Sequence, residues 1–514
     1  MSSGNPIIRA ELVLFLLAVF AGAYFNNGTA WNHVSRLDTI FAFVEPTSAD
    51  HLSFRIDRFI TEPEAGINTG DWALYDNHYY SNKAPGAALL GIPIYFVIYH
   101  FEKLLGIQPE DEFASQINAY FLNIFVSVVP VGMALACFYR LLLLLRPGDT
   151  RKAAVLTVTL FLGTLLFPYT TQLWGHSTAA AWVIIAVYFF VRGGLRDGIA
   201  SGFFAGLAVA TEYSCILTVL SLVTVLAANR KWPQLGMLCL GGLAPLVVFA
   251  VYHKMCFGQF ITFANRYNNP YFLDAGYAAG LFGWATVKEA IPGLTISSYR
   301  GLFVHMPVLL LIGPALACRW PRGCRSIYWL CIGNIAGYLL LNLIFNGWHG
   351  GACCGPRYQI PALPFYVLLL SGLPLSPRSP GKFRIVRPVG MALLLVSGAN
   401  MFVCAVVSPV IPQNVPKPLK VYYVGLSEGY LNAWGRIHLV SALPMRNESL
   451  RADPVMRFSA FNLGELAGLR GLASLVPWMI GVGLGLGMLG YATTRGEDGI
   501  VSENARAIVE NDNN

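Results

Sequence analysis

The sequence predicts an all-α integral membrane protein. Hydrophobic residues make up 55% of the chain and charged residues only 12%, whereas soluble domains carry about 25% charged residues. The mean hydropathy is +0.55. Apolar runs of roughly 15–25 residues recur along the chain, and such runs match the hydrocarbon thickness of a bilayer. Because lipid offers no partners for backbone N–H and C=O groups, each run is expected to be helical.

The net charge of +8 comes from short basic clusters between the apolar runs. This placement is typical of cytoplasmic loops, which are enriched in Lys and Arg. A nucleic-acid partner is therefore excluded, and membrane lipids are the expected surroundings. The clusters that we assign to the cytoplasmic side occupy residues 146–152, 192–196, 230–231, 319–325 and 378–387.

The basic clusters also determine how often the chain crosses. If all of them face the cytoplasm, the number of crossings between neighbouring clusters is even, which predicts about 12 membrane segments with both termini in the cytoplasm. The apolar run 199–228 must then turn back near Glu212. The run 87–105 cannot cross completely, and we interpret it as an interfacial or re-entrant helix.

The same count predicts the domain organisation. Residues 1–375 form a membrane module whose first extracytoplasmic loop is 25–116. Residues 376–494 form C-terminal membrane helices with an extracytoplasmic loop at 411–471, and 495–514 form a polar cytoplasmic tail.

The candidate site lies in the external loops, which hold most of the histidines and most of the acids. Ionisable residues that converge at a membrane surface indicate a functional site. The loop 25–116 is the richest, and its stretch Asn32 to Gly86 ends in the sequence His78-Tyr79-Tyr80-Ser81-Asn82-Lys83-Ala84-Pro85-Gly86. A plain structured loop is the alternative interpretation.

Several short motifs occur in order along residues 1–375. They are Ser35-Arg36-Leu37-Asp38, Ile56-Asp57, Thr69-Gly70-Asp71, the segment His78 to Gly86, Gly175-His176-Ser177, Thr211-Glu212-Tyr213, Ser298 to Phe303, Gly347 to Gly351 and Gly355 to Pro361. Together they resemble the GT-C glycosyltransferases, in particular bacterial members related to the protein O-mannosyltransferases and the lipid A aminoarabinose transferase. The resemblance implies a GT-C-like multispanning helical fold with a long first extracytoplasmic loop that bears juxtamembrane helices.

The resemblance also implies an activity. A sugar would move, with inversion, from a polyprenyl-phosphate donor to an acceptor hydroxyl on the extracytoplasmic face of a bacterial inner membrane. The acceptor would be a cell-envelope glycan, a lipid or a protein. Two alternatives stay open: a flippase or transporter of lipid-linked sugars, and a diphosphate-dependent polymerase or ligase. The second would use the late arginines Arg436, Arg446, Arg451 and Arg457.

The catalytic base is expected to be a carboxylate, because the acceptor hydroxyl must lose its proton as it attacks. Asp38 matches the position of the base in related proteins, although Thr39 follows it where they often have Glu. Asp57 is the second candidate. Helix capping or an ion pair with Arg36, Arg55 or Arg58 is the alternative role for each aspartate.

The donor phosphate is expected to need cations. Lys83 matches the family's phosphate-binding lysine, while Arg300 and Arg357 can grip phosphate oxygens bidentately. Snorkelling to the membrane interface is the alternative role for Lys83, and interfacial anchoring is the alternative for the arginines. Some branches of the family use a divalent metal, but no ligand spacing here predicts a metal site. Residues with expected supporting or substrate-binding roles are Asp71, His78, Tyr80, His176, Glu212, His349 and Tyr358.

Overall fold

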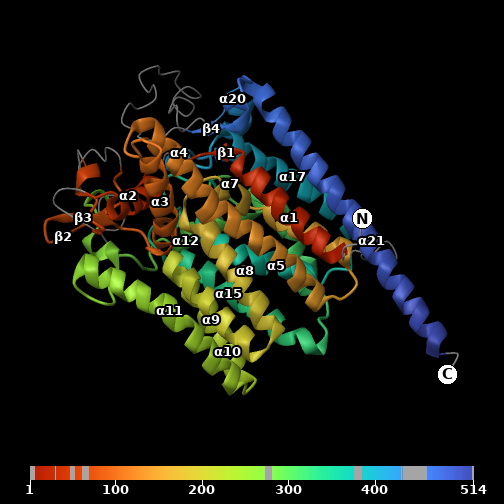
Figure 1. The fold of residues 1–514 in the computed structure, drawn as a ribbon. Helices are drawn as coiled ribbons and strands as arrows, with labels where there is room; N and C mark the ends of the chain where they lie inside the picture. Colours follow the sequence, from red (N-terminus) through yellow and green to blue (C-terminus); the bar gives the residue numbers. More distant parts are fainter. Residues whose placement is uncertain are drawn as a thin grey trace.

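The protein, seen here as a computed structural model, is built almost entirely of helices (Figure 1). The structure describes residues 6–28, 30–46, 52–60, 69–272, 280–374, 385–429, 431 and 460–511. Within these ranges, eight helical stretches are long and apolar enough to cross a membrane: α1 (Pro6–Ala23), α3 (Gly86–Leu104), α4–α5 (Glu112–Leu145), α8 (Gly175–Arg192), α11 (Trp232–Phe257), Arg322–Ile344, α17 (Val386–Val407) and Gly471–Thr494. The prediction of an all-α integral membrane protein is confirmed.

Other apolar segments form shorter or interrupted helices, so the number 12 stays a prediction. A π-helical turn at Ile124–Val128 separates α4 (Glu112–Asn123) from α5 (Val129–Leu145). The other helices are α2 (Trp31–Val44), α6 (Thr150–Leu162), α7 (Leu166–Thr170), α9 (Leu195–Thr211), α10 (Ile216–Ala228), α12 (Val287–Thr295), α13 (Leu302–His305), α14 (Ile312–Leu316), α15 (Arg325–Ile344), α16 (Leu363–Leu370), α18 (Pro418–Ser427), α20 (Leu463–Leu466) and α21 (Val476–Asn511).

The predicted reversal at Glu212 is present. Glu212 is extended (φ −146°, ψ 116°) and ends α9. Helices α9 and α11 approach closely through glycines: a Cβ on Gly202 would lie 1.9 Å from the Leu238 carbonyl oxygen, and one on Gly206 would lie 2.9 Å from Pro245. Small residues permit such backbone contact between membrane helices. Since sequence numbers rise together along this contact, α9 and α11 are parallel, and α10 returns the chain between them.

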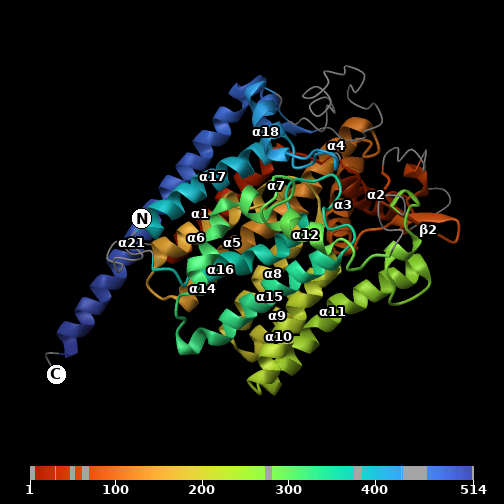
Figure 2. The same cartoon turned by 180° about the vertical axis from the view of Figure 1, so that it is seen from behind.

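Helices α1 and α21 lie side by side at one edge of the bundle (Figures 1 and 2). A Cβ on Gly481 would touch Phe20, and one on Gly485 would touch Leu17, so the two helices are antiparallel. The start of α1 and the residues after Thr494 therefore share one end of the bundle, as two termini on the same side require. Helix α21 continues to Asn511, where we expected only a polar tail.

The described parts of the first loop pack against the bundle. Helix α2 is buried over most of its length, and β2 (Trp72–Tyr75) pairs antiparallel with β3 (His78–Ser81). Asp76 and Asn77 have φ values of 51° and 59°, as a two-residue type I′ hairpin turn requires. A second small sheet joins β1 (Phe25–Asn26) to β4 (Phe461–Asn462). Helix α3 follows β3 as one continuous helix, and its interfacial position stays a prediction.

Candidate active site

A buried cluster of charged side chains lies where α2, the start of α8 and the break after α9 meet. The Arg36 guanidinium, in a residue only 1% exposed, donates through Nη2 to Glu212 Oε1 at 3.3 Å. His176 Nδ1 lies 3.4 Å from the same oxygen. Burial raises the pKa of Glu212, and the nearby charges of Arg36, Arg357 and Lys83 oppose this rise. A buried carboxylate is costly without such cations, so these groups are energetically coupled.

Two backbone features fix Arg36 and Glu212 in contact. Arg36 Nη1 donates to the Asn32 carbonyl oxygen one turn earlier at 3.0 Å, and also to the Asn32 side chain. A Cβ on Gly175 would lie 2.4 Å from Glu212 Oε1 and 2.8 Å from Arg36 Nη2. The glycine of the Gly-His-Ser motif is therefore needed because a larger residue would occupy the space that this ion pair fills.

The β2–β3 hairpin places the Lys83 side chain next to the Asp71 carboxylate. Lys83 Nζ lies 2.8 Å from Asp71 Oδ1, and the two side chains are 18% and 9% exposed. Ser35 of α2 holds both strand ends: its hydroxyl donates to the Asp71 carbonyl oxygen at 2.6 Å and lies 2.7 Å from Ser81 Oγ. The Lys83–Asp71 pair is thus positioned by α2, through the residue directly before Arg36.

The residues after Lys83 join this pair to the Glu212 cluster. A Cβ on Gly86 would lie 2.6 Å from the Thr211 nitrogen, so the start of α3 touches the end of α9 directly beside Glu212. Burial lowers the pKa of Lys83, Asp71 opposes this, and Arg357 and Arg36 lower it further. The site therefore has an excess of positive charge around two carboxylates.

Arg357 enters from the loop before α16. Its guanidinium lies over the rings of Trp174 at 4.8 Å and Tyr358 at 5.0 Å, and Nη2 donates to the Tyr358 hydroxyl at 3.2 Å. Within the described residues, the buried Arg357 Nε and His176 Nε2 atoms have no hydrogen-bond partner. Buried donors usually have partners, so Arg357 Nε is a candidate for contact with a bound anion. Because His176 Nδ1 faces the Glu212 carboxylate, its Nε2 is the accepting nitrogen of the neutral ring.

A cavity of about 320 Å³, which we call the inner cavity, opens beside these groups. Asp71 and Arg357, which are far apart in the sequence, both line this cavity. Its lining residues are Ala30, Trp31, Asn32, Asp71, Trp174, Tyr271, Phe272, His349, Gly350, Gly351, Ala352, Arg357, Val410, Pro412 and Gln413.

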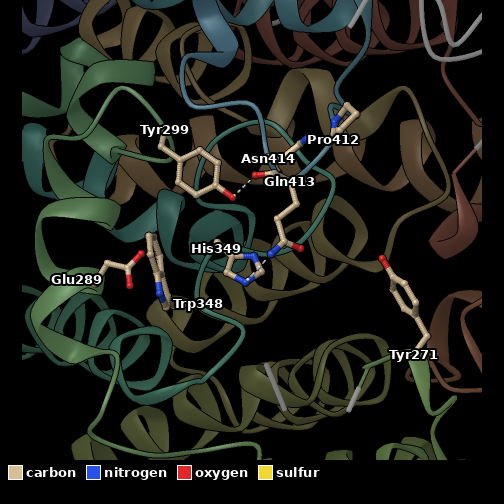
Figure 3. A pocket seen from close by; sticks show the side chains of 8 residues that line it. All are labelled: Tyr271, Glu289, Tyr299, Trp348, His349, Pro412, Gln413 and Asn414. Carbon is tan, nitrogen blue, oxygen red and sulfur yellow. Dashed lines mark hydrogen bonds between the residues drawn. The ribbon is translucent and has the colours of Figure 1, made fainter. Parts of the chain in front are cut away.

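A second space of about 660 Å³, which we call the outer cavity, adjoins the inner one (Figure 3). Tyr271, His349, Pro412 and Gln413 line both cavities. The outer cavity is completed by four further residues: Glu289, Tyr299, Trp348 and Asn414.

His349 stands between the two cavities as a neutral ring. Burial, with Arg300 and Arg357 nearby, lowers its pKa to about 4. Its Nδ1 accepts the Gly351 N–H at 3.0 Å, so the proton of the neutral ring is on Nε2. Gln413 Nε2 lies 3.2 Å from that His349 Nε2. Two donors cannot bond to each other, so we assign the flipped amide, whose oxygen accepts from His349, since amide orientation follows from the hydrogen-bond network.

The two aspartates predicted as bases do not line either cavity. Asp38 is fully buried in α2. Asp57 Oδ2 lies 2.8 Å from His78 Nδ1, and Asp57 Oδ1 accepts the Tyr79 N–H at 2.6 Å. Asp57 and His78, predicted separately, are therefore partners that brace the hairpin. Tyr80 packs on Phe257 with ring centroids 5.5 Å apart.

Arg300, predicted to hold phosphate, has another set of contacts. It is fully buried, and it donates to the carbonyl oxygens of His349 and Gly351 at 2.9 Å each. These bonds fix the loop that carries His349. Arg300 lines neither cavity, which favours a positioning role.

Of the predicted residues, the structure brings together Asp71, Lys83, His176, Glu212, His349, Arg357 and Tyr358. It adds Arg36, which the sequence suggested only as an ion-pair partner, and the aromatic walls Trp174, Tyr271 and Trp348. Within the described ranges, no group of three His, Cys, Asp or Glu side chains could hold a metal ion. The divalent metal that the resemblance allows therefore has no assigned ligands there.

Comparison with known proteins gives distant structural matches. No protein-family model and no curated protein matches the sequence. ArnT from Cupriavidus metallidurans, solved with undecaprenyl phosphate, is 14% identical with a TM-score of 0.42, over 95% of this chain and 77% of its own. The Archaeoglobus fulgidus oligosaccharyltransferase in the apo form is 12% identical with a TM-score of 0.44, over 88% of this chain and 60% of its own. AglB from the same organism, solved with an inhibitory peptide and a dolichol-phosphate, is 14% identical with a TM-score of 0.42, over 87% and 60%. These proteins belong to the group that the sequence resembles.

Proposed function

We propose that this protein is an inverting membrane glycosyltransferase that moves a sugar from a polyprenyl-phosphate donor to an acceptor hydroxyl. The observation that supports this most directly is the meeting of Lys83, Asp71 and Arg357, from distant parts of the chain, beside one cavity. The reaction has two requirements: cations that bind the donor phosphate, and a carboxylate that accepts the proton of the acceptor hydroxyl.

Lys83 and Arg357 hold the donor phosphate in this proposal. The buried Arg357 Nε, without a partner among the described residues, supplies one donor for its oxygens. Guanidinium and ammonium groups both suit phosphate, the first bidentately and the second as a point charge. Arg36 remains paired with the Glu212 carboxylate and offsets its charge, and His176 remains beside the same carboxylate.

Asp71 is the base that we propose, in place of Asp38 and Asp57, because Asp71 lines the inner cavity and the other two line neither the inner nor the outer cavity. When the phosphate binds, it draws Lys83 from Asp71 and leaves the carboxylate free to accept a proton. The acceptor oxygen then attacks the anomeric carbon and gives its proton to Asp71. The bond from that carbon to the phosphate oxygen breaks, and polyprenyl phosphate leaves with its negative charge facing Lys83 and Arg357.

We further propose that the site faces the extracytoplasmic side of a bacterial inner membrane, with the isoprenoid tail of the donor among the membrane helices. The positive-inside pattern of the basic loops supports this orientation. Labelling of a cysteine placed at Asn414, with a membrane-impermeant maleimide on intact cells, tests it. Labelling only after the membrane is opened would contradict the proposed side.

The decisive experiment measures transfer from radiolabelled polyprenyl-phosphate mannose, glucose and arabinose in proteoliposomes that contain cell-envelope extract as acceptor. We expect label to enter a product that survives mild acid, and Asp71→Asn to lower the rate by about 10²–10⁴-fold. Asp57→Asn is the matched control and should keep most of the rate. Label that crosses the bilayer without transfer would identify a flippase, and activity only with diphosphate-linked donors would identify a polymerase or ligase.

A further inference from the structure

The outer cavity has a lining that differs from that of a lipid groove. Its apolar surface comes from three aromatic rings and one proline: Tyr271, Tyr299, Trp348 and Pro412. Among the residues that the structure describes, no Leu, Ile, Val or Met side chain lines it. Aliphatic side chains best match an acyl chain, whereas the flat faces of aromatic rings match the C–H faces of sugar rings. The Tyr hydroxyl and the Trp N–H also allow these rings to border water.

The remaining lining residues offer planar hydrogen-bonding groups. They are a carboxylate on Glu289, amides on Gln413 and Asn414, and the imidazole of His349. Carboxylates and amides accept or donate two hydrogen bonds in one plane, which matches pairs of neighbouring sugar hydroxyls. In the part of the chain that the structure describes, neither the Glu289 carboxylate nor the Tyr271 hydroxyl has a hydrogen-bond or ion-pair partner, so both can serve a ligand.

The walls of the outer cavity are preorganised. Trp348 packs on Ala290 and Leu294 of α12, and its carbonyl oxygen accepts from Asn342 Nδ2 at 3.0 Å. A Cβ on Gly293 would lie 2.3 Å from the Trp348 ring, so this glycine provides the space for the indole. A rigid site loses less conformational entropy when a ligand binds.

Figure 3 shows how the polar and aromatic groups surround the space. Glu289 lies beside the Trp348 ring, Gln413 and His349 form the middle, and Tyr271 stands on the opposite side. Because Gln413, His349 and Tyr271 also line the inner cavity, a ligand in the outer cavity can extend toward Asp71. The volume of about 660 Å³ lies within the range of roughly 300–1,000 Å³ that is usual for ligand pockets.

We propose that the outer cavity is a saccharide-binding site that holds the end of a glycan acceptor, with sugar rings against Tyr271 and Trp348 and hydroxyls on Glu289 and Gln413. As the acceptor site, it rests on the transferase function proposed above. It narrows that function, because it selects a glycan acceptor over a lipid anchor or a protein segment.

Saturation-transfer NMR on the full chain in lipid nanodiscs, without any donor, tests the site independently of transfer. The probes are maltotriose, mannotriose and an arabinan trisaccharide, with a Ser/Thr-containing tripeptide as the comparison ligand. We expect at least one trisaccharide to bind. Glu289→Gln and Tyr271→Ala should each weaken that binding about 10-fold, as expected for the loss of one charged hydrogen bond or one stacking wall.

Two matched variants control this experiment. Glu112→Gln changes an exposed glutamate on α4, outside both cavities, and should leave binding unchanged. Tyr271→Phe keeps the ring and should retain most of the affinity. The proposal is overturned if no trisaccharide binds, if binding survives in both cavity variants, or if only the tripeptide responds to Glu289→Gln. Since no donor is present, none of these outcomes depends on the proposed transfer reaction.

Discussion

The two adjoining cavities differ in the polar and charged residues that border them. Both cavities have aromatic walls, and they share four lining residues. The inner cavity is bordered by buried charges on α2, the hairpin and the loop before α16, whereas the outer cavity adds exposed polar groups on loops and α12. Buried charges act over a distance and suit a step in which charge moves. Aromatic and amide surfaces suit recognition of a neutral ligand. In the roles that we propose, the inner cavity carries the chemistry and the outer cavity selects the acceptor, and each variant below tests that separation.

The largest effect is expected for Gly175→Ala at the inner cluster. The added methyl would lie 2.4 Å from Glu212 Oε1 and 2.8 Å from Arg36 Nη2, which forces the ion pair apart. Overpacking of this kind costs about 1–3 kcal/mol, and the displaced charges should remove nearly all transfer activity. Thermal unfolding and transfer rate are the measurements. Gly236→Ala on α11, with open space around the glycine, is the control and should change neither.

Lys83→Met should have the next largest effect. It removes the cation that we assign to the donor phosphate and leaves Asp71 without its partner. Charged hydrogen bonds contribute about 1.5–3 kcal/mol, so donor affinity should fall by roughly 10- to 150-fold. Lys103→Met, on the exposed end of α3, should change donor affinity less than twofold, because surface ion pairs contribute little free energy. Equal effects of the two variants would show that Lys83 only anchors the loop.

The sequence predicted the fold through hydropathy and charge bias, which act over whole segments. It also predicted the break at Glu212, because one long helix would have violated the alternation of sides. It named Asp38 and Asp57 as the candidate bases and Asp71 as a supporting residue, whereas we propose Asp71 as the base. All three lie in the same polar loop, and only the hairpin register, with Ser35 bound to the Asp71 carbonyl, turns Asp71 toward the cavity.

The outer cavity was not predicted from the sequence. Glu289, Trp348 and Gln413 come from three separate loops or short helices, and nothing in their local sequences marks them as neighbours. Their meeting depends on long-range contacts such as the bond from the Tyr299 hydroxyl to the Gln413 carbonyl oxygen. The late arginines Arg436, Arg446, Arg451 and Arg457 lie outside the described residues, so their predicted alternative role remains a prediction.

A smaller effect is expected from protonation of His349, which stands between the cavities. Because its pKa is about 4 in the folded chain and about 6.5 when unfolded, the unfolded chain binds more protons between these values. Stability should therefore fall as the pH drops from about 6.5 toward 4. Melting temperatures at pH 7 and pH 4.5 measure this. His349→Gln should reduce the difference, and an unchanged difference would assign it to other groups.

The smallest effect is expected for Tyr299→Phe at the edge of the outer cavity. The variant keeps the ring and loses only the hydroxyl that donates to the Gln413 carbonyl oxygen at 2.6 Å. One such hydrogen bond contributes about 0.5–1.5 kcal/mol. Because this bond positions Gln413 and not the charged cluster, the acceptor KM should rise about threefold to tenfold, while kcat and the donor KM stay the same. A fall in kcat instead would mean that the loop holding Gln413 also orders the inner cavity, and the two cavities would then have to be treated as one site.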